Sequence, residues 1–261
     1  MPARRPAPNG VLDQRLGVAD KTTACRTCNK KVTECAGHFG HVEFQLPLFH
    51  IGFFKHTLTI CQCICKSCSA ILLSANDREF FLRKLRKPSI DALMKASIFK
   101  KIIEKCKKSH RCERCGAFNG PVKKISNVAT LKLAHEKFKG KQAEPDHAAL
   151  HNNLKAAMAY NQELAQHLHK AQEDLSPVVV LELFKQITDE DCELLWMDPT
   201  VGRPENLLLS AILVPPVPIR PSVAMDTGAG SNEDDLTVKL QEIVTNNDAL
   251  GLALQKGAKM S

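Results

Sequence analysis

The 261-residue sequence has little of several features that mark common classes of protein. It contains one Trp, one Tyr and 5% aromatic residues in all, which indicates a core poor in aromatic rings. No run of 18 apolar residues occurs, and residues 1–5 (MPARR) lack the apolar stretch of a signal peptide. We therefore expect one or two modest domains of an intracellular protein, with no membrane partner.

Motifs of common catalytic sites are also missing. Neither a Gly-rich phosphate loop nor a His-Glu-x2-His pattern is present. The acidic residues at 189–193 fit the polar face of a short helix better than a pair of catalytic carboxylates. The residues alone therefore predict a binding and scaffolding chain.

Cysteine, by contrast, is abundant, with 11 residues. In a reducing compartment disulfides explain this number poorly, and pairs spaced Cys-x2-Cys indicate metal binding instead. One set of candidate ligands lies within 14 residues, so that two tight turns can close on one tetrahedral ion. This set is Cys25, Cys28, Cys35 and His38. His41 competes with His38, but the shorter Cys-x2-His spacing favours His38.

A second candidate set consists of two Cys-x2-Cys pairs separated by 43 residues. The long separation costs little, because the entropy of loop closure grows only with the logarithm of length. Each set supplies four protein ligands and leaves no open position for a substrate, which predicts two structural zinc ions. The second set is Cys65, Cys68, Cys112 and Cys115. The remaining thiols of this region, Cys61, Cys63 and Cys106, are expected to be small buried residues rather than a redox pair.

The formal net charge of +8 is distributed unevenly. Residues 1–77 carry +4, residues 78–141 carry +14 from 19 basic and 5 acidic residues, and residues 142–261 carry −10. A basic block beside metal ligands favours nucleic acid as a partner, although a solvated helix face remains the alternative, and the acidic part favours protein contacts. The candidate nucleic-acid-binding residues are Arg83, Lys84, Lys100, Lys101, Lys107, Lys108, Arg111 and Arg114.

The first half of the chain shows both strand and helix periodicity. Alternating apolar residues predict a strand over 42–46 that ends at Pro47, followed by a helix over roughly 51–64. Ser74 or Asn76 can cap a further helix that ends at Pro88. The apolar positions of a second, basic helix run from Ile90 to Ile103, and include Leu93 and Met94.

The second half is expected to be mainly helical. Residues 146–172 lack Gly and Pro and predict a long helix, and Ser176-Pro177 predicts the start of a helix through Phe184. Four prolines within 214–221 exclude a helix or a central strand there and predict an extended, docked or linker segment. A helix over 232–254 follows an acidic start, with Leu236, Leu240 and Leu250 on its apolar face.

Several stretches taken together resemble the family of the largest subunits of multisubunit DNA-dependent RNA polymerases, in the N-terminal clamp region. They are GVLDQRLG at 10–17, CRTCNKKVTECAGHFGH at 25–41, the cysteine pairs at 65–68 and 112–115, VPPVPIRPS at 214–222 and NEDDLTVKL at 232–240. The RNA polymerase III branch is indicated by FHIGFFKHTLTICQCICKSC, RCERCGAFNGPVKK and SNEDDLTVKLQEIV. The resemblance covers about residues 10–256, in order.

The resemblance implies an α+β fold, mostly helical with short strands, in which zinc at the two ligand sets stabilises a mobile clamp. In that family the clamp closes over DNA and the RNA–DNA hybrid during transcription, here of small non-coding RNAs in the nucleus. It further implies assembly with the other RNA polymerase III subunits, including the second-largest. The helix from 232 resembles the first arm of the clamp coiled coil, which contacts initiation factors.

The sequence departs from the family pattern in two respects. It contains no Asn-Ala-Asp-Phe-Asp-Gly-Asp run, whose aspartates hold the catalytic magnesium, and it stops at Ser261, before the second arm of the coiled coil. We therefore expect a truncated fragment that is a DNA-directed RNA polymerase (nucleotidyltransferase) by membership of the complex and inactive alone. Magnesium is expected only in the complete polymerase.

The expected organisation has five parts. They are a disordered lead-in at 1–10, a zinc-binding clamp core with a basic helical insertion at 11–142, a helical part at 143–213, a Pro-rich extended segment at 214–231 and the first arm at 232–261. Three alternatives remain: the same region of RNA polymerase II or I, an independent zinc-dependent nucleic-acid-binding protein, and a structural adaptor that docks through its acidic half.

Overall fold

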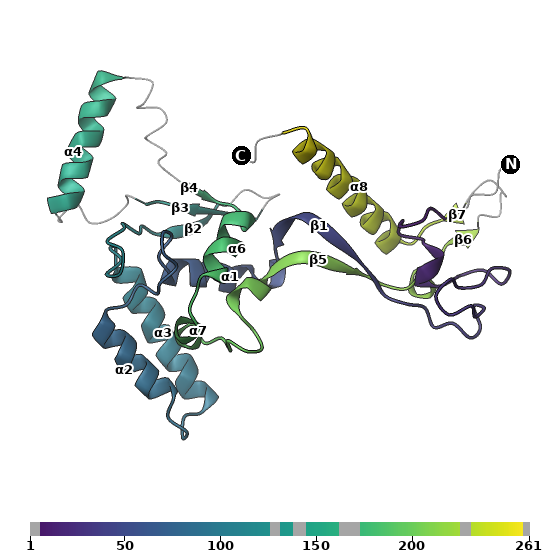
Figure 1. Ribbon diagram of the computed structural model, residues 1–261, viewed down its shortest axis with the longest axis horizontal. Coiled ribbons are helices and arrows are strands. Elements are labelled where there is room, and N and C mark those ends of the chain that lie inside the picture. The colour runs from purple at the N-terminus through teal and green to yellow at the C-terminus, as the bar shows by residue number, and fades with distance from the viewer. Residues whose placement is uncertain (1–5, 126–130, 138–144, 162–172, 225–230, 258–261) are drawn as a thin grey trace. The chain divides into compact units, whose positions relative to one another are not determined.

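The computed structural model describes residues 6–125, 131–137, 145–161, 173–224 and 231–257 (Figure 1). Helices and short strands are mixed, as expected. The chain forms two units, Met1–Leu46 with Ser210–Ser261, and Pro47–Leu209. Within the described ranges, every helix is too short or too polar to cross a bilayer.

The first unit is built around short strands and one long helix. Strand β1 (Gly40–Phe49) pairs with β5 (Leu208–Val214), and β6 (Val223–Ala224) pairs with β7 (Ser231–Asn232). The helical elements are η1 (Gln14–Leu16), η4 (Val217–Ile219) and α8 (Asp235–Gln255). A small core of Val11, Val214 and Leu240 joins the N-terminal segment, β5 and α8.

Strand β1 is longer than the sequence predicted, because it continues through Pro47 to Phe49. Proline lacks a backbone N–H donor and is therefore tolerated in edge strands. In the two-stranded sheet of β1 and β5 both strands are edges, so the expected break at Pro47 was wrong.

The Pro-rich segment is docked against its own unit rather than free. Its middle forms the 3-10 turn η4, a helical turn that the prediction had excluded, and the short turn accommodates proline in its first positions. The fully buried Arg220 donates from Nε to the Pro215 carbonyl at 3.0 Å and from a terminal nitrogen to Thr237 Oγ1 at 3.1 Å. It also donates to the Val11 carbonyl, and so joins three separate segments.

Helix α8 begins at Asp235, three residues after the predicted start at 232, within the acidic stretch, and Asp234 Oδ1 caps it by accepting from the Leu236 N–H at 2.8 Å. The predicted apolar face is only partly buried: Leu240 is buried, whereas 54% of Leu236 is exposed. Asn247 fixes the helix to β1 instead, because its Oδ1 accepts from the Gln45 N–H and its Nδ2 donates to the Glu43 carbonyl, both at 2.9 Å.

The second unit is mainly helical. Its helical elements are η2 (Ile51–Phe53), α1 (Phe54–Cys63), α2 (Ala75–Leu85), α3 (Ala92–Lys108), α4 (Pro145–Tyr160), α6 (Pro177–Lys185), α7 (Asp189–Leu194) and η3 (Pro204–Leu207). Strands β2 (Val122–Ile125), β3 (Lys132–His135) and β4 (Glu173–Leu175) form an antiparallel sheet in that order. Figure 1 shows α2 and α3 lying side by side.

The predicted helices of this unit are present. Ser74, rather than Asn76, caps α2 by accepting from the Asp77 N–H at 3.2 Å, and Ser176 caps α6 by accepting from the Val179 N–H at 3.4 Å. Helix α4 covers the first part of the long helix predicted from 146, and residues 162–172 of that prediction lie outside the described residues. A turn lies at 113–115, and Gly116 follows it with a φ of 71°.

The apolar face predicted for α3 is covered over only part of its length. Ile102 and Cys106 are buried, but 82% of Leu93 and 57% of Met94 are exposed. Helix α1, against which α3 packs, has 10 residues where α3 has 17, so it cannot cover the whole face. The prediction was therefore wrong for the N-terminal turns of α3.

Candidate metal centres and basic surface

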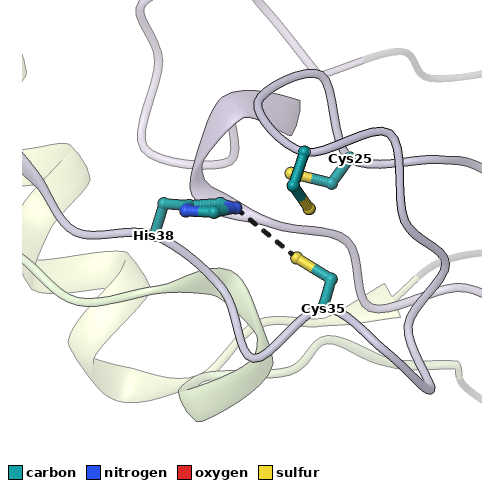
Figure 2. Close-up of side chains that lie close together, drawn as sticks. Cys25, Cys35 and His38 are labelled. Carbon is teal, nitrogen blue, oxygen red and sulfur yellow. Dashed lines mark hydrogen bonds between the residues drawn. The ribbon is translucent and has the colours of Figure 1, made fainter.

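The first candidate ligand set lies in the first unit, and its four residues converge. The donor atoms of Cys25, Cys28, Cys35 and His38 all lie within 4.8 Å of one another. Figure 2 shows the labelled side chains pointing toward one another from the surrounding loops, with Cys35 Sγ 3.7 Å from His38 Nε2. A tetrahedral ion with Zn–S of about 2.3 Å and Zn–N of about 2.0 Å separates sulfur and nitrogen ligands by about 3.5 Å. The set therefore matches a zinc site in both composition and spacing.

The second set brings together two cysteine pairs that are distant in sequence. Its four sulfurs also lie within 4.8 Å of one another, with 3.6 Å between Cys65 and Cys115 and 3.7 Å between Cys68 and Cys112. The corresponding sulfur–sulfur distance in a tetrahedral zinc site is about 3.8 Å. Each short distance joins a sulfur of one pair to a sulfur of the other, so an ion held there would cross-link the two pairs.

Every Cys-x2-Cys pair forms the same tight turn, which we call a knuckle and which spans residues 25–30, 65–70 and 112–117. The N–H of the first cysteine donates to the carbonyl five residues later, at 3.0, 2.8 and 3.0 Å. The residue four positions later donates back to the cysteine carbonyl and has a positive φ. These residues are Asn29 (57°), Ser69 (58°) and Gly116 (71°). The left-handed residue closes each turn and leaves both sulfurs on one side.

Gly37 fixes the loop that carries the last two ligands of the first set. Its φ is 90°, and a Cβ atom there would lie 2.4 Å from the Pro216 Cβ. The neighbouring His38 N–H donates to the Leu16 carbonyl at 3.2 Å. Only glycine allows this approach, which holds the ligand loop against the Pro-rich and N-terminal segments.

The thiol pKa values fit sites that require a cation. Burial raises the pKa of Cys65, but hydrogen bonds from the Ser67 N–H and the Asn119 amide lower it to about 6. Burial and the neighbouring thiols raise the pKa of Cys68 in the same set to about 12. The first set contains a similar contrast, with the pKa of Cys25 lowered to about 6 and that of Cys35 raised. Four crowded thiols cannot all ionise unaided, and a bound dication would supply the compensating charge.

Two residues near the second set were not found from the sequence. Asn119 is buried and donates to Cys65 Sγ at 3.3 Å. Lys66 donates from Nζ to the Ile64 carbonyl at 2.8 Å, and burial lowers its pKa to about 8. Cysteine spacing carries no information about either, although the position of Lys66 inside a Cys-x2-Cys pair placed it close to the site.

The other thiols and His41 lie apart from both sets. Cys61, Cys63 and Cys106 are buried, as predicted, and donation of a hydrogen bond to Cys63 together with burial raises the pKa of Cys106. Cys192 is buried in α7, where burial raises its pKa to about 11. His41 lies exposed on β1, 3.5 Å from Glu43.

The eight candidate basic residues are all exposed, but the structure does not gather them on one surface. Lys84, Lys101 and Lys108 line a hollow of about 350 Å³ between α2 and α3, together with Phe80 and Phe81. Lys100 and Lys107, two turns apart, share another face of α3.

The other three candidates lie elsewhere. Arg83 pairs with Glu79 at 2.5 Å within α2. Arg111 and Arg114 flank the knuckle at 112–117, where Arg111 donates to the Gly116 carbonyl at 3.2 Å.

Two basic residues that were not candidates, Arg78 in α2 and Arg86 at its C-terminal cap, have acidic partners. Arg78 Nε lies 2.9 Å from the buried Asp191 Oδ1, and Arg86 Nε lies 2.9 Å from Glu193 Oε2. Asp191, which was expected on the polar face of a short helix, is buried instead. Its Oδ2 also accepts from the Ile71 N–H at 3.3 Å, so this acidic residue is structural.

Comparison with known proteins identifies the class to which this fold and these ligand sets belong. The family model of RNA polymerase Rpb1, domain 1, matches residues 1–261, and the chain belongs to that family. It is similar to the DNA-directed RNA polymerase III subunit rpc1 of Dictyostelium discoideum, with 49% identity over 94% of this chain. It is likewise similar to the subunits RPC1 of Saccharomyces cerevisiae (46% over 99%) and Homo sapiens (44% over 96%). The chain spans 17–18% of the length of these relatives. The comparisons thus support the N-terminal region of the largest subunit of RNA polymerase III.

Proposed function

We propose that the chain forms the zinc-binding clamp region of the largest subunit of a nuclear RNA polymerase III. It would close over DNA and the RNA–DNA hybrid during transcription of small non-coding RNAs. The observation that carries the proposal is the convergence of two complete four-ligand sets, in a chain that the Rpb1 domain 1 model matches throughout. Its contribution would be mechanical, since RNA synthesis needs the magnesium site of the complete polymerase.

Zinc would act here as a structural cross-link. Cys25, Cys28, Cys35 and His38 would hold one ion, and the four cysteines at 65–68 and 112–115 the other. Each ion would have four protein ligands and no position for a substrate. In the second set the ion would tie the end of α1 to the far end of α3, across the helical segment between them.

The lysines of α3 are the strongest candidates for phosphate contacts. Lys100, Lys101, Lys107 and Lys108 are exposed on two neighbouring faces of one helix, so their ammonium groups can follow a phosphate backbone. Phosphate contacts position a protein without reading sequence, so we expect no base preference. Arg111 and Arg114 would extend this surface beside the second ligand set.

The remaining assignments rest on the family. The partners would be the other RNA polymerase III subunits, including the second-largest, and initiation factors at α8, the proposed first arm of the coiled coil. The expected five-part division of the chain also stays a proposal.

Purification of the tagged chain from cells, with a zinc count and identification of co-purifying proteins, tests the function. We expect two zinc ions per chain, one lost in Cys28→Ser and the other in Cys112→Ser. Cys192→Ser is the matched control and should keep both, because Cys192 lies outside either set. Recovery of polymerase subunits supports the clamp assignment. Zinc-bound chain that recovers nucleic acid but no polymerase subunit would identify an independent nucleic-acid-binding protein instead.

A further inference from the structure

Asn119 occupies an unusual place beside the second ligand set. It lies just after the knuckle at 112–117, yet its side chain reaches the knuckle at 65–70, and only 3% of the residue is exposed. Its Nδ2 donates to Cys65 Sγ at 3.3 Å, and its Oδ1 accepts from the Lys66 N–H at 2.9 Å. One side chain therefore joins two knuckles that are more than 40 residues apart in sequence.

The orientation of the Asn119 amide is fixed by its partners. Nδ2 also donates to the Ala117 carbonyl at 3.0 Å, and Oδ1 faces the Lys66 N–H. Exchanging the amide oxygen and nitrogen would place oxygen against oxygen and N–H against N–H. The N–H group directed at Cys65 Sγ is thus required by the whole network. The Asn119 N–H donates in turn to the His110 carbonyl at 2.8 Å, which anchors the residue to the segment just before its own knuckle.

We propose that Asn119 is a positioning residue for the metal at the second ligand set. Its amide donates to the Cys65 thiolate and holds the two knuckles in register, so that the four sulfurs stay at the spacing of a tetrahedral ion. Donation to a thiolate withdraws negative charge from the sulfur, which lowers its reactivity while it remains a ligand. The inference rests on the proposed zinc function and concerns the second set alone. Around the first set, the hydrogen bonds of the described residues include no side-chain amide donor to sulfur.

The test is the rate at which each of the two zinc ions moves to a coloured chelator from the full chain. Asn119→Asp keeps the side-chain shape and the acceptor for the Lys66 N–H, but loses the donor to Cys65. We expect it to release one ion about 10–100-fold faster, the usual effect of losing such a supporting hydrogen bond. The other ion, in the first set, should leave at its original rate and serves as an internal reference. Asn153→Asp, on the exposed surface of α4, is the control for the added charge.

A second measurement separates positioning from general destabilisation. In cobalt-substituted protein, Asn119→Asp should shift the thiolate-to-cobalt absorption band, because the sulfur has lost a hydrogen bond, whereas Asn153→Asp should not. Unchanged release and an unchanged band in Asn119→Asp would overturn the proposal. Loss of both ions at equal rates would also overturn it, since the effect would then be general. If the unaltered chain binds no zinc, the proposed metal function fails instead, and the two failures are distinguishable.

Discussion

Removal of zinc should affect the two ligand sets very differently, because their surroundings differ. Around the first set, the buried cluster consists of Cys25, Cys35 and Val18, with Cys28 and Val32 partly buried. Val18 is thus the only fully buried member that is not a ligand. Cys65 and Cys112 belong instead to the large core of the second unit. We expect the first set to lose its structure without metal, and the knuckle at 65–70 to keep it.

The magnitude follows from these contacts. Full burial of one valine stabilises by roughly 1.5–3 kcal/mol. Structural zinc contributes roughly 10–16 kcal/mol in small domains, and ordering each residue costs roughly 1–2 kcal/mol. Val18 and Val32 cannot replace the metal, so the loop from 18 to 38 should open. Each 1.4 kcal/mol changes an equilibrium about tenfold, so losing even about 4 kcal/mol raises amide exchange roughly 1000-fold.

Hydrogen exchange followed by mass spectrometry or NMR measures this directly. After chelation, the amides of Cys25 and Asn29, which donate within the first knuckle, should exchange at nearly the unfolded rate. The amides of Cys65 and Ser69, which make the equivalent bonds in the second unit, should keep most of their protection. Cys28→Ser should reproduce the first effect without a chelator. Retained protection at Cys25, or equal loss at both knuckles, would refute the reasoning.

Two further predictions concern charge. If α3 faces nucleic acid, replacing Lys107 and Lys108 together by Ala should weaken binding of any sequence. The slope of log affinity against log salt concentration, measured by fluorescence anisotropy, should fall in magnitude by roughly two. An unchanged slope would indicate a solvated face. The hydrogen bond from Arg86 holds the pKa of Glu193 below its ordinary value of 4.5. The stabilisation from this ion pair is therefore fully present above pH 4.5 and is lost as the pH falls through the lowered pKa. Denaturant unfolding measures the free energy of unfolding at each pH. Between pH 6 and 3 this free energy should fall less in Glu193→Gln than in the unaltered chain, and an identical pH dependence in the two would contradict the assignment.

The candidate metal ligands could be predicted from the sequence because their spacing is a local property of the chain. Spacing within a knuckle decides whether two sulfurs can share an ion, and both ligand sets named from spacing do converge. Helix starts at Ser74 and Ser176 were predictable for the same reason, since a cap involves only the next three residues.

Features set by distant partners were not accessible in this way. Asn119 contacts Cys65 only because two separate knuckles meet, and no local pattern marks it. Asp191 was assigned only to the polar face of a short helix, because its partner Arg78 lies 113 positions earlier in the chain. The exposure of Leu93 depends on the length of α1, which periodicity within α3 cannot reveal.

The distribution of partners also changes how the net charge of the basic block should be interpreted. Residues 78–141 carry +14, but two of their arginines pair with acidic residues of α7. Arg78 of α2 pairs with Glu190 and Asp191, and Arg86, which caps the end of α2, pairs with Glu193. These ion pairs connect two parts of the second unit, and the positive charges of both arginines face carboxylates. Helix α3 packs less extensively on α7 than α2 does, and most of the lysines of α3 point to solvent. The segment total therefore overstates the charge available to a phosphate backbone. The charge that remains available is concentrated on α3 and beside the second ligand set, where a metal cross-link would fix its position.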